Sequence, residues 1–166
     1  METTIRQATS KDASAIVRFN LLIAEETEHL HLDGERLHKG VQALLKDPSK
    51  GVYFLAESDG NVVGQLMITY EWSDWRNGNF WWIQSVYVDR LHRGKGVFRS
   101  LYQHVYDLAS RRADVCGLRL YVESRNKRAR QAYEQLGMKK ARYEMYEIDF
   151  VLKQPTQVSD NSKGSN

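Results

Sequence analysis

The sequence predicts a single domain of the α/β (α+β) class, in which about four helices flank a mixed, mostly antiparallel sheet. Within residues 52–70, two apolar stretches lie on either side of the turn Asp59-Gly60-Asn61, which is typical of an antiparallel hairpin. A third long strand is expected at residues 80–88, after the turn-rich residues 73–78. The second half differs, because a strand–helix–strand–helix pattern runs from residue 80 to residue 136.

Helical spacing and helix-ending residues predict the other elements. Apolar side chains at Ile16, Phe19 and Ile23 indicate a helix after the capping residues 9–12, and a second helix is expected at 36–46. A helix of about four turns begins at Val97 and has one apolar face. The predicted domain spans 1–152 and is completed by strands at 3–6, 118–122 and 142–152, a helix at 129–136, and a disordered tail at 153–166.

Composition limits the class of protein. The 166 residues are 42% hydrophobic and include 4 Trp, 9 Tyr and 5 Phe, which is enough to form a core and excludes global disorder. No apolar run approaches the roughly 18 residues of a membrane span, and the first residues lack the layout of a signal peptide. A single cysteine, Cys116, excludes an intramolecular disulfide. We therefore expect a cytoplasmic protein that does not bind a membrane.

Charge is distributed unevenly along the chain. The formal net charge is +3, but residues 1–88 carry 8 basic and 12 acidic side chains, whereas residues 89–131 carry 11 basic and 4 acidic ones. The basic segment is therefore expected to bind an anionic ligand, and the acidic segment is expected to face a cationic one. A nucleic-acid-binding module is the competing interpretation of the basic segment, and the acidic first half argues against it.

Residues 85–98 place Gly94 and Gly96 between a strand and a helix. Glycines let backbone N–H groups approach a ligand, and a helix N-terminus adds positive potential, so the loop suits a phosphate or pyrophosphate. An ordinary strand-to-helix turn is the alternative. The spacing excludes a Walker loop, and Arg99 stands where the dinucleotide fingerprint requires a third small residue.

A second pattern lies at Asn126 and Tyr133, which are seven residues apart and so share one side of a helix. A packed tyrosine is the alternative explanation for Tyr133. Taken together, the chain resembles the GNAT superfamily of acyl-CoA-dependent N-acetyltransferases. The family's pyrophosphate loop falls on residues 91–96, its Asn-x-x-Ala-x-x-x-Tyr-x-x-x-Gly pattern falls on residues 126–137, and its opening falls on residues 5–12. Leu91 and Phe98 depart from the family pattern.

This resemblance implies a sheet of six to seven strands that splays between the fourth strand, 80–88, and the fifth, 117–123. It implies acetyl-CoA as co-substrate and no metal. It also implies that Tyr133 is the general acid that protonates the CoA thiolate, and that a backbone N–H near Val86 stabilises the oxyanion. The cofactor-binding residues implied are Val86, Tyr87, Val88, Arg93, Gly94, Lys95, Gly96, Val97, Phe98, Arg99, Asn126 and Tyr133.

The general base is not fixed by the sequence. The polyamine acetyltransferases, which the chain resembles most, commonly have a Glu where this chain has Gln84, and a glutamine cannot accept a proton. Glu26, Glu71 and Asp74 are the leading candidates. The acidic residues of 25–35 form either a solvated helix face or a negative rim that attracts a cation. His29 and His31 lack a third ligand at helical spacing, so no metal site is predicted.

The expected reaction is transfer of an acetyl group from acetyl-CoA to a primary amine of a small cationic substrate, such as a diamine, polyamine or amino-acid derivative. Three alternatives stay open: a protein N-terminal acetyltransferase, a lysine acetyltransferase, and a CoA-binding protein without activity. The four tryptophans at 72, 75, 81 and 82 serve the core, a homodimer contact or the acceptor site.

Overall fold

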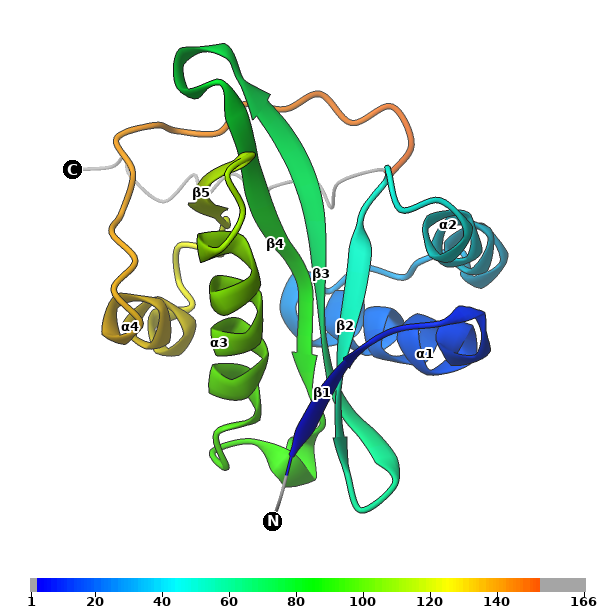
Figure 1. Ribbon diagram of the computed structural model, residues 1–166. Helices are drawn as coiled ribbons and strands as arrows, with labels where there is room; N and C mark the ends of the chain where they lie inside the picture. Colours follow the sequence, from blue (N-terminus) through cyan, green and yellow to red (C-terminus); the bar gives the residue numbers. More distant parts are fainter. Residues whose placement is uncertain (1–2, 153–166) are drawn as a thin grey trace, which may run out of the picture. The chain divides into compact units, whose positions relative to one another are not determined.

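The computed structural model describes residues 3–152, which form two compact units (Figure 1). The first unit ends at Tyr121 and the second begins at Val122. No helix among the described residues is both long and apolar enough to cross a lipid bilayer.

A five-stranded sheet forms the centre of the first unit. Its strands are β1 (Thr4–Gln7), β2 (Val52–Ser58), β3 (Asn61–Ser73), β4 (Gly78–Val88) and β5 (Val115–Arg119), and they lie side by side in that order. The first three pairings are antiparallel and the β4–β5 pairing is parallel, so the predicted mixed sheet is confirmed. The expected count of six to seven strands is corrected to five within residues 3–152.

Helices cover both faces of this sheet (Figure 1). One face carries α1 (Ala13–Ile23), which continues as the π-helical turn η2 (Ala24–Glu28), and α2 (Gly34–Lys46). The other face carries α3 (Val97–Ser110). Three short 3-10 turns, η1 (Ser10–Asp12), η3 (Asp74–Arg76) and η4 (Arg90–His92), connect the elements. The helices expected from the sequence are thus formed.

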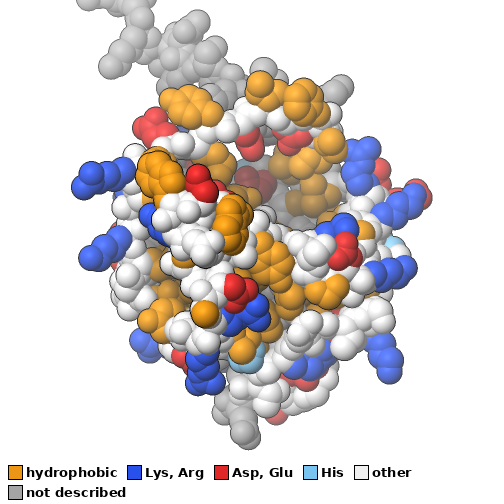
Figure 2. Space-filling view, turned by 45° about the horizontal axis from the view of Figure 1, so that its top comes forward, with side chains coloured by type: hydrophobic (Ala, Val, Ile, Leu, Met, Phe, Trp, Pro, Cys, Tyr) orange, Lys and Arg blue, Asp and Glu red, His pale blue; other side chains and the backbone are white. Residues whose placement is uncertain are grey.

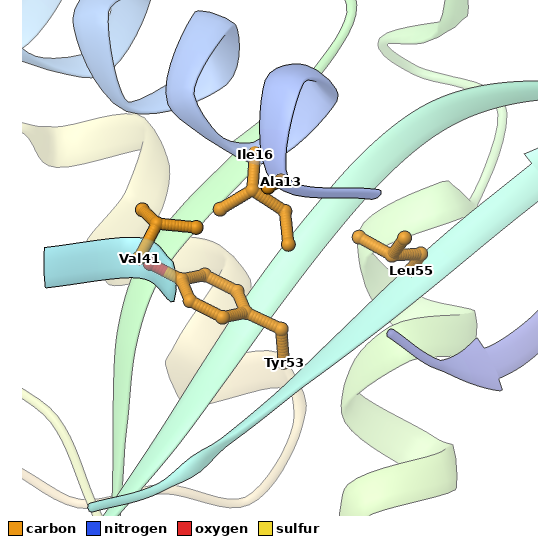
Figure 3. Close-up of a cluster of buried hydrophobic side chains, with 5 residues drawn as sticks. All are labelled: Ala13, Ile16, Val41, Tyr53 and Leu55. Carbon is orange, nitrogen blue, oxygen red and sulfur yellow. The ribbon is translucent and has the colours of Figure 1, made fainter. Parts of the chain in front are cut away.

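A cluster of buried side chains fixes α1 and α2 against the sheet (Figure 3). Ala13 and Ile16 of α1 meet Val41 of α2 above Tyr53 and Leu55 of β2, and each of the five is at most 6% exposed. Tyr53 and Leu55 are two residues apart, so they point to the same face of the sheet. Burial of this apolar area sets where α1 lies and therefore where its C-terminal end meets β4.

The second unit contains α4 (Lys127–Gln135), and the strand predicted at residues 142–152 is wrong. The sequence alternates suitably there, but a strand forms only by pairing, and no described strand pairs with these residues. Their apolar side chains stay exposed, with Tyr146 at 89% and Phe150 at 92%. The predicted tail, 153–166, lies outside the described residues.

Ion pairs made by Arg6 connect β1 to η1 and to the neighbouring strand β2. Its guanidinium donates to Asp12 at 2.8 Å and 2.9 Å, and to Glu57 of β2 at 2.6 Å and 2.8 Å. The hydrogen bonds from Arg6 outweigh partial burial and lower the pKa of Asp12 to about 2. Because the folded carboxyl binds a proton more weakly than an unfolded one, Asp12 stabilises the fold above pH 4 and loses that effect as the pH falls towards 2.

We expect Asp12→Asn to reduce the free energy of unfolding at pH 7 by on the order of 1 kcal/mol, because solvent screens part of the ion pair. The difference from the wild-type protein should shrink as the pH is lowered from about 4 to about 2, where Asp12 becomes protonated. Urea unfolding across this range measures both effects. Asp59→Asn, in the exposed hairpin turn, is the control, and an equal loss in that variant would contradict this role for Asp12.

Candidate functional site

A β-bulge interrupts β4 near its C-terminal end. Gln65 of β3 pairs with Tyr87 and Met67 pairs with Gln84, so two residues of β4, Ser85 and Val86, stand opposite one residue of β3. Ser85 adopts the left-handed backbone conformation with φ of 49°. That conformation costs a non-glycine residue roughly 1–2 kcal/mol, so other contacts must hold it.

A buried polar network lies against this bulge. Gln65 Nε2 donates to the Ser85 carbonyl oxygen at 3.1 Å and to Asn20 Oδ1 at 3.0 Å. Asn20 Nδ2 in turn donates to the Tyr53 hydroxyl at 3.0 Å. Burial raises the pKa of Tyr53, although hydrogen bonds with Asn20 and Ser85 oppose that rise. The network therefore connects α1, β2 and β3 to the bulge in β4.

Beyond the bulge, one edge of β4 has no neighbouring strand. β5 pairs only with residues 79–82 of β4, ending at the pair Trp82 and Arg119. Residues 83–88, which we call the free edge, therefore have no strand partner on the β5 side within the described chain. The pairing of β4 with β5 thus stops after Trp82, as the predicted splay between the fourth and fifth strands requires. Val86 and Val88 lie on the free edge. Backbone groups of such an edge can pair with an extended ligand.

The free edge leads into the glycine loop, residues 89–96. Asp89 begins η4 by accepting a hydrogen bond from Leu91 N at 3.0 Å. Gly94 and Gly96 have φ of +76° and +83°, a region that favours glycine. The first turn of α3 follows, and Ser100 N donates to the carbonyl oxygen of its N-cap, Gly96, at 3.0 Å. The first backbone N–H groups of a helix point out of its N-terminal end, where they can bind an anion.

Glu26 holds two arginines of this loop in place. Its carboxylate accepts from Arg90 Nε at 3.0 Å and from Arg93 Nη2 at 2.8 Å. Arg93 Nε also donates to the Val88 carbonyl oxygen at 2.9 Å. The Tyr87 hydroxyl donates to Glu26 at 3.0 Å, and the Tyr87 ring packs 4.9 Å from that of Phe19. The Tyr87 side chain therefore belongs to the core, which leaves its backbone for a ligand.

These contacts decide the chemistry of Glu26. Burial alone would raise its pKa, but hydrogen bonds from Arg93 and Tyr87 outweigh burial, and the pKa is lowered. A carboxylate with a lowered pKa is a weak proton acceptor, so the geometry favours Glu26 as a support of the glycine loop. Lys95 and Arg99 are exposed and form no ion pair among the described residues.

Glu71, the second candidate base, lies across from the start of β4. Its carboxylate accepts from Trp82 Nε1 at 2.5 Å and from Arg119 Nη1 at 3.0 Å. The hydrogen bond from Trp82 is the main cause of a lowered pKa for Glu71, and Arg119 adds to it. On the same face, Gln84 Nε2 donates to the Thr69 hydroxyl at 2.5 Å.

Asp74, the third candidate, lies in η3 at the tip of the β3–β4 hairpin. Its carboxylate is exposed and accepts from Trp75 N at 2.9 Å. Trp75 is 86% exposed and Trp72 is 59% exposed. Figure 2, which brings the upper end of Figure 1 forward, shows hydrophobic side chains at the surface with acidic side chains among them.

The remaining tryptophans, Trp81 and Trp82, are partly buried with different neighbours. Trp81 packs against Tyr70 with ring centroids 6.3 Å apart, and Trp82 packs against Tyr121 at 5.9 Å. Packing within the first unit therefore accounts for both rings.

In the second unit, Asn126 stands immediately before α4 and Tyr133 lies within it. Asn126 caps the helix, because its Oδ1 accepts from Ala129 N at 3.1 Å. Burial raises the pKa of the Tyr133 phenol. The phenol therefore stays protonated at neutral pH, as a proton donor must.

The first unit brings Val86, Tyr87 and Val88 into continuity with residues 93–99, and Glu26 lies beside them. Glu71 and Asp74 lie at the opposite end of β4. Sequence reasoning missed Asn20, Gln65 and Ser85, although a glutamine in the apolar middle of β3 is a visible signal. No group of three His, Cys, Asp or Glu side chains within residues 3–152 is arranged to hold a metal ion.

Known structures and families share this architecture. A solved structure described as a possible acetyltransferase from Clostridium difficile 630 is 45% identical, with a TM-score of 0.84, and the match covers 92% of this chain and 100% of that one. A predicted acetyltransferase from Clostridium acetobutylicum, solved with acetyl-CoA, is 21% identical with a TM-score of 0.72, covering 89% and 96%. Ribosomal-protein-alanine N-acetyltransferase from Brucella melitensis is 23% identical with a TM-score of 0.71, covering 90% and 100%.

No curated protein matches the sequence. The model of the acetyltransferase (GNAT) family matches residues 17–138, which include the bulge, the glycine loop and α4. The two glycines, the bulged fourth strand and the parting of β4 from β5 all lie within that match. The chain therefore belongs to the GNAT family of acetyltransferases.

Proposed function

We propose that the protein transfers an acetyl group from acetyl-CoA to the primary amine of a small cationic substrate, such as a diamine, polyamine or amino-acid derivative. The amine attacks the thioester directly in a ternary complex of enzyme, acetyl-CoA and acceptor. One observation carries this proposal: the free edge of β4 runs directly into the glycine loop. An extended arm that ends in a pyrophosphate needs these two features in that order.

The residues present fit such a co-substrate. The backbone of Val86 and Val88 would pair with the pantetheine arm, and the amides of the loop and of the first turn of α3 would bind the pyrophosphate. The exposed Lys95 and Arg99 add positive charge. Arg93 contributes through its backbone, because its side chain is held by Glu26 and by the Val88 carbonyl.

The chemistry begins with a neutral amine. A primary amine has a pKa of roughly 10.4, so at pH 7 only about one molecule in two thousand can attack. The amine nitrogen bonds to the acetyl carbon, and the carbonyl oxygen becomes an oxyanion that the backbone N–H near Val86 stabilises. The C–S bond then breaks, and Tyr133 gives its proton to the departing thiolate.

The protonated form of the amine, which predominates at pH 7, must lose a proton before it can attack. Glu26 and Glu71 are both paired with arginines and have lowered pKa values, so each would hold a proton weakly. The exposed carboxylate of Asp74 accepts from one backbone amide, Trp75 N. This comparison favours release of the proton through water, because Asp74 lies at the opposite end of β4 from Val86.

A panel of acceptors tests the proposed function. We expect thiol release from acetyl-CoA with diamines, polyamines or amino-acid derivatives, at rates that fall as salt screens attraction to Glu25 and Glu28. The same assay is run with peptides that have a free N-terminus, and with lysine-containing peptides whose N-terminus is blocked. Faster turnover of either peptide would replace the small-amine proposal, and no thiol release with any acceptor would contradict acetyl transfer itself.

Gly96→Ala tests the loop. A Cβ at φ of +83° strains the turn, so we expect the Kd for acetyl-CoA to rise about tenfold or more in calorimetry. Gly40→Ala, in the interior of α2, has open space around the new Cβ and should leave the Kd unchanged. Equal affinity in both variants would show that the cofactor does not depend on this loop.

Tyr133→Phe tests the general acid. Removal of the hydroxyl should lower kcat by about a hundredfold while the KM for acetyl-CoA changes little, because the proton is needed only as the thiolate departs. Tyr143→Phe, at a 79% exposed tyrosine of the same unit, is the control. A kcat equal to that of the wild-type protein would remove Tyr133 from this role.

A further inference from the structure

Gln65 is a polar side chain in the apolar middle of β3, and it is 0% exposed. No hydrogen-bond donor among the described residues reaches its Oε1. A buried acceptor without a donor destabilises a fold, and an apolar side chain of the same size avoids that cost. The unpaired Oε1 is therefore a cost to stability that the other half of the amide has to offset.

The amide nitrogen of Gln65 accounts for the residue. Nε2 donates to the carbonyl oxygen of Ser85, the residue in the left-handed conformation, at 3.1 Å. The Ser85 C=O and the Val86 N–H belong to one planar peptide unit and point in opposite directions across it. A hydrogen bond that fixes the Ser85 oxygen therefore also fixes the direction of the Val86 N–H, away from Gln65.

Asn20 fixes the amide of Gln65 in turn. Its Oδ1 accepts the second hydrogen bond of Nε2 at 3.0 Å, and its own amide donates to the Tyr53 hydroxyl. Asn20 lies in α1, which the buried cluster of Ala13 and Ile16 holds against the sheet. The orientation of the Ser85–Val86 peptide thus depends on a packed helix outside β4.

We propose that Gln65 is a positioning residue for acetyl transfer, which acts by holding the Ser85–Val86 peptide so that the Val86 N–H is aimed at the oxyanion. This inference rests on the proposed function. Gln65 does not touch the reacting atoms, and Asn20 supports it from α1. The network serves the rate of the chemical step rather than the binding of acetyl-CoA, because the pyrophosphate is bound by the glycine loop.

Gln65→Met tests this role, since methionine keeps the length of the side chain and removes both donated hydrogen bonds. We expect kcat to fall about tenfold or more, because the Val86 N–H is no longer held in the direction of the oxyanion. The Kd for acetyl-CoA should stay within about threefold of the wild-type value. We also expect amide hydrogen exchange at Val86 to become about tenfold faster in the absence of substrate. Ile68→Val, a buried substitution in the same strand, is the matched control for lost packing.

Each outcome decides the proposal. An unchanged kcat, or an equal fall of kcat in Ile68→Val, would overturn it, as would unchanged exchange at Val86. Asn20→Ala should give smaller changes in the same direction, and it replaces Gln65→Met as the deciding variant if that protein does not fold. If the wild-type protein transfers no acetyl group, the proposed function fails by itself, and exchange at Val86 still shows whether Gln65 holds the peptide.

Discussion

The bulge at Ser85 in β4 is the constraint on which the rest of the site depends. It places a serine in a left-handed conformation at a cost of roughly 1–2 kcal/mol, in the middle of an otherwise regular antiparallel pairing. The hydrogen bond from the buried amide of Gln65 to the Ser85 carbonyl oxygen offsets part of that cost, by about 1 kcal/mol. Beyond the bulge, β4 keeps β3 on one side and has no described strand on the other.

The segment formed by α1 and η2 connects the two halves of the proposed cofactor site. Asn20 reaches the bulge through Gln65, Phe19 packs on Tyr87, and Glu26 holds Arg93 of the glycine loop. A shift of this segment would therefore move the free edge and the loop together. The same contacts explain why Glu26, which looks like a proton acceptor in the sequence, is better suited to support the loop.

Periodicity and turn residues were sufficient to predict the antiparallel hairpins and the helices, because those features depend on local patterns. The splay after the fourth strand was implied only by the family resemblance. The bulge was not predictable, since residues 80–88 alternate as one regular strand and nothing local shows that Ser85 leaves the ladder. The strand expected at residues 142–152 failed for the opposite reason. Its pattern gives local propensity only, and strand formation requires a neighbour that the pattern does not supply.

Among the site residues, the glycines were predictable because a left-handed φ nearly requires them, whereas the states of Glu26 and Glu71 were not. Their partners, Arg93 and Arg119, are distant in the sequence and become neighbours only in the fold. The charge asymmetry of the sequence thus needs one refinement. Arg93, which was expected to bind the cofactor, and its neighbour Arg90 share the one carboxylate of Glu26 from the acidic half, which offsets part of their positive charge.

A crystal structure with acetyl-CoA tests the central claim most directly. The account predicts the pantetheine arm along the free edge of β4 and the pyrophosphate within hydrogen-bond distance of amides between Gly94 and the first turn of α3. The carbonyl oxygen of the thioester should lie near the Val86 N–H. A cofactor bound elsewhere, or a free edge closed by another strand in the complex, would contradict the account.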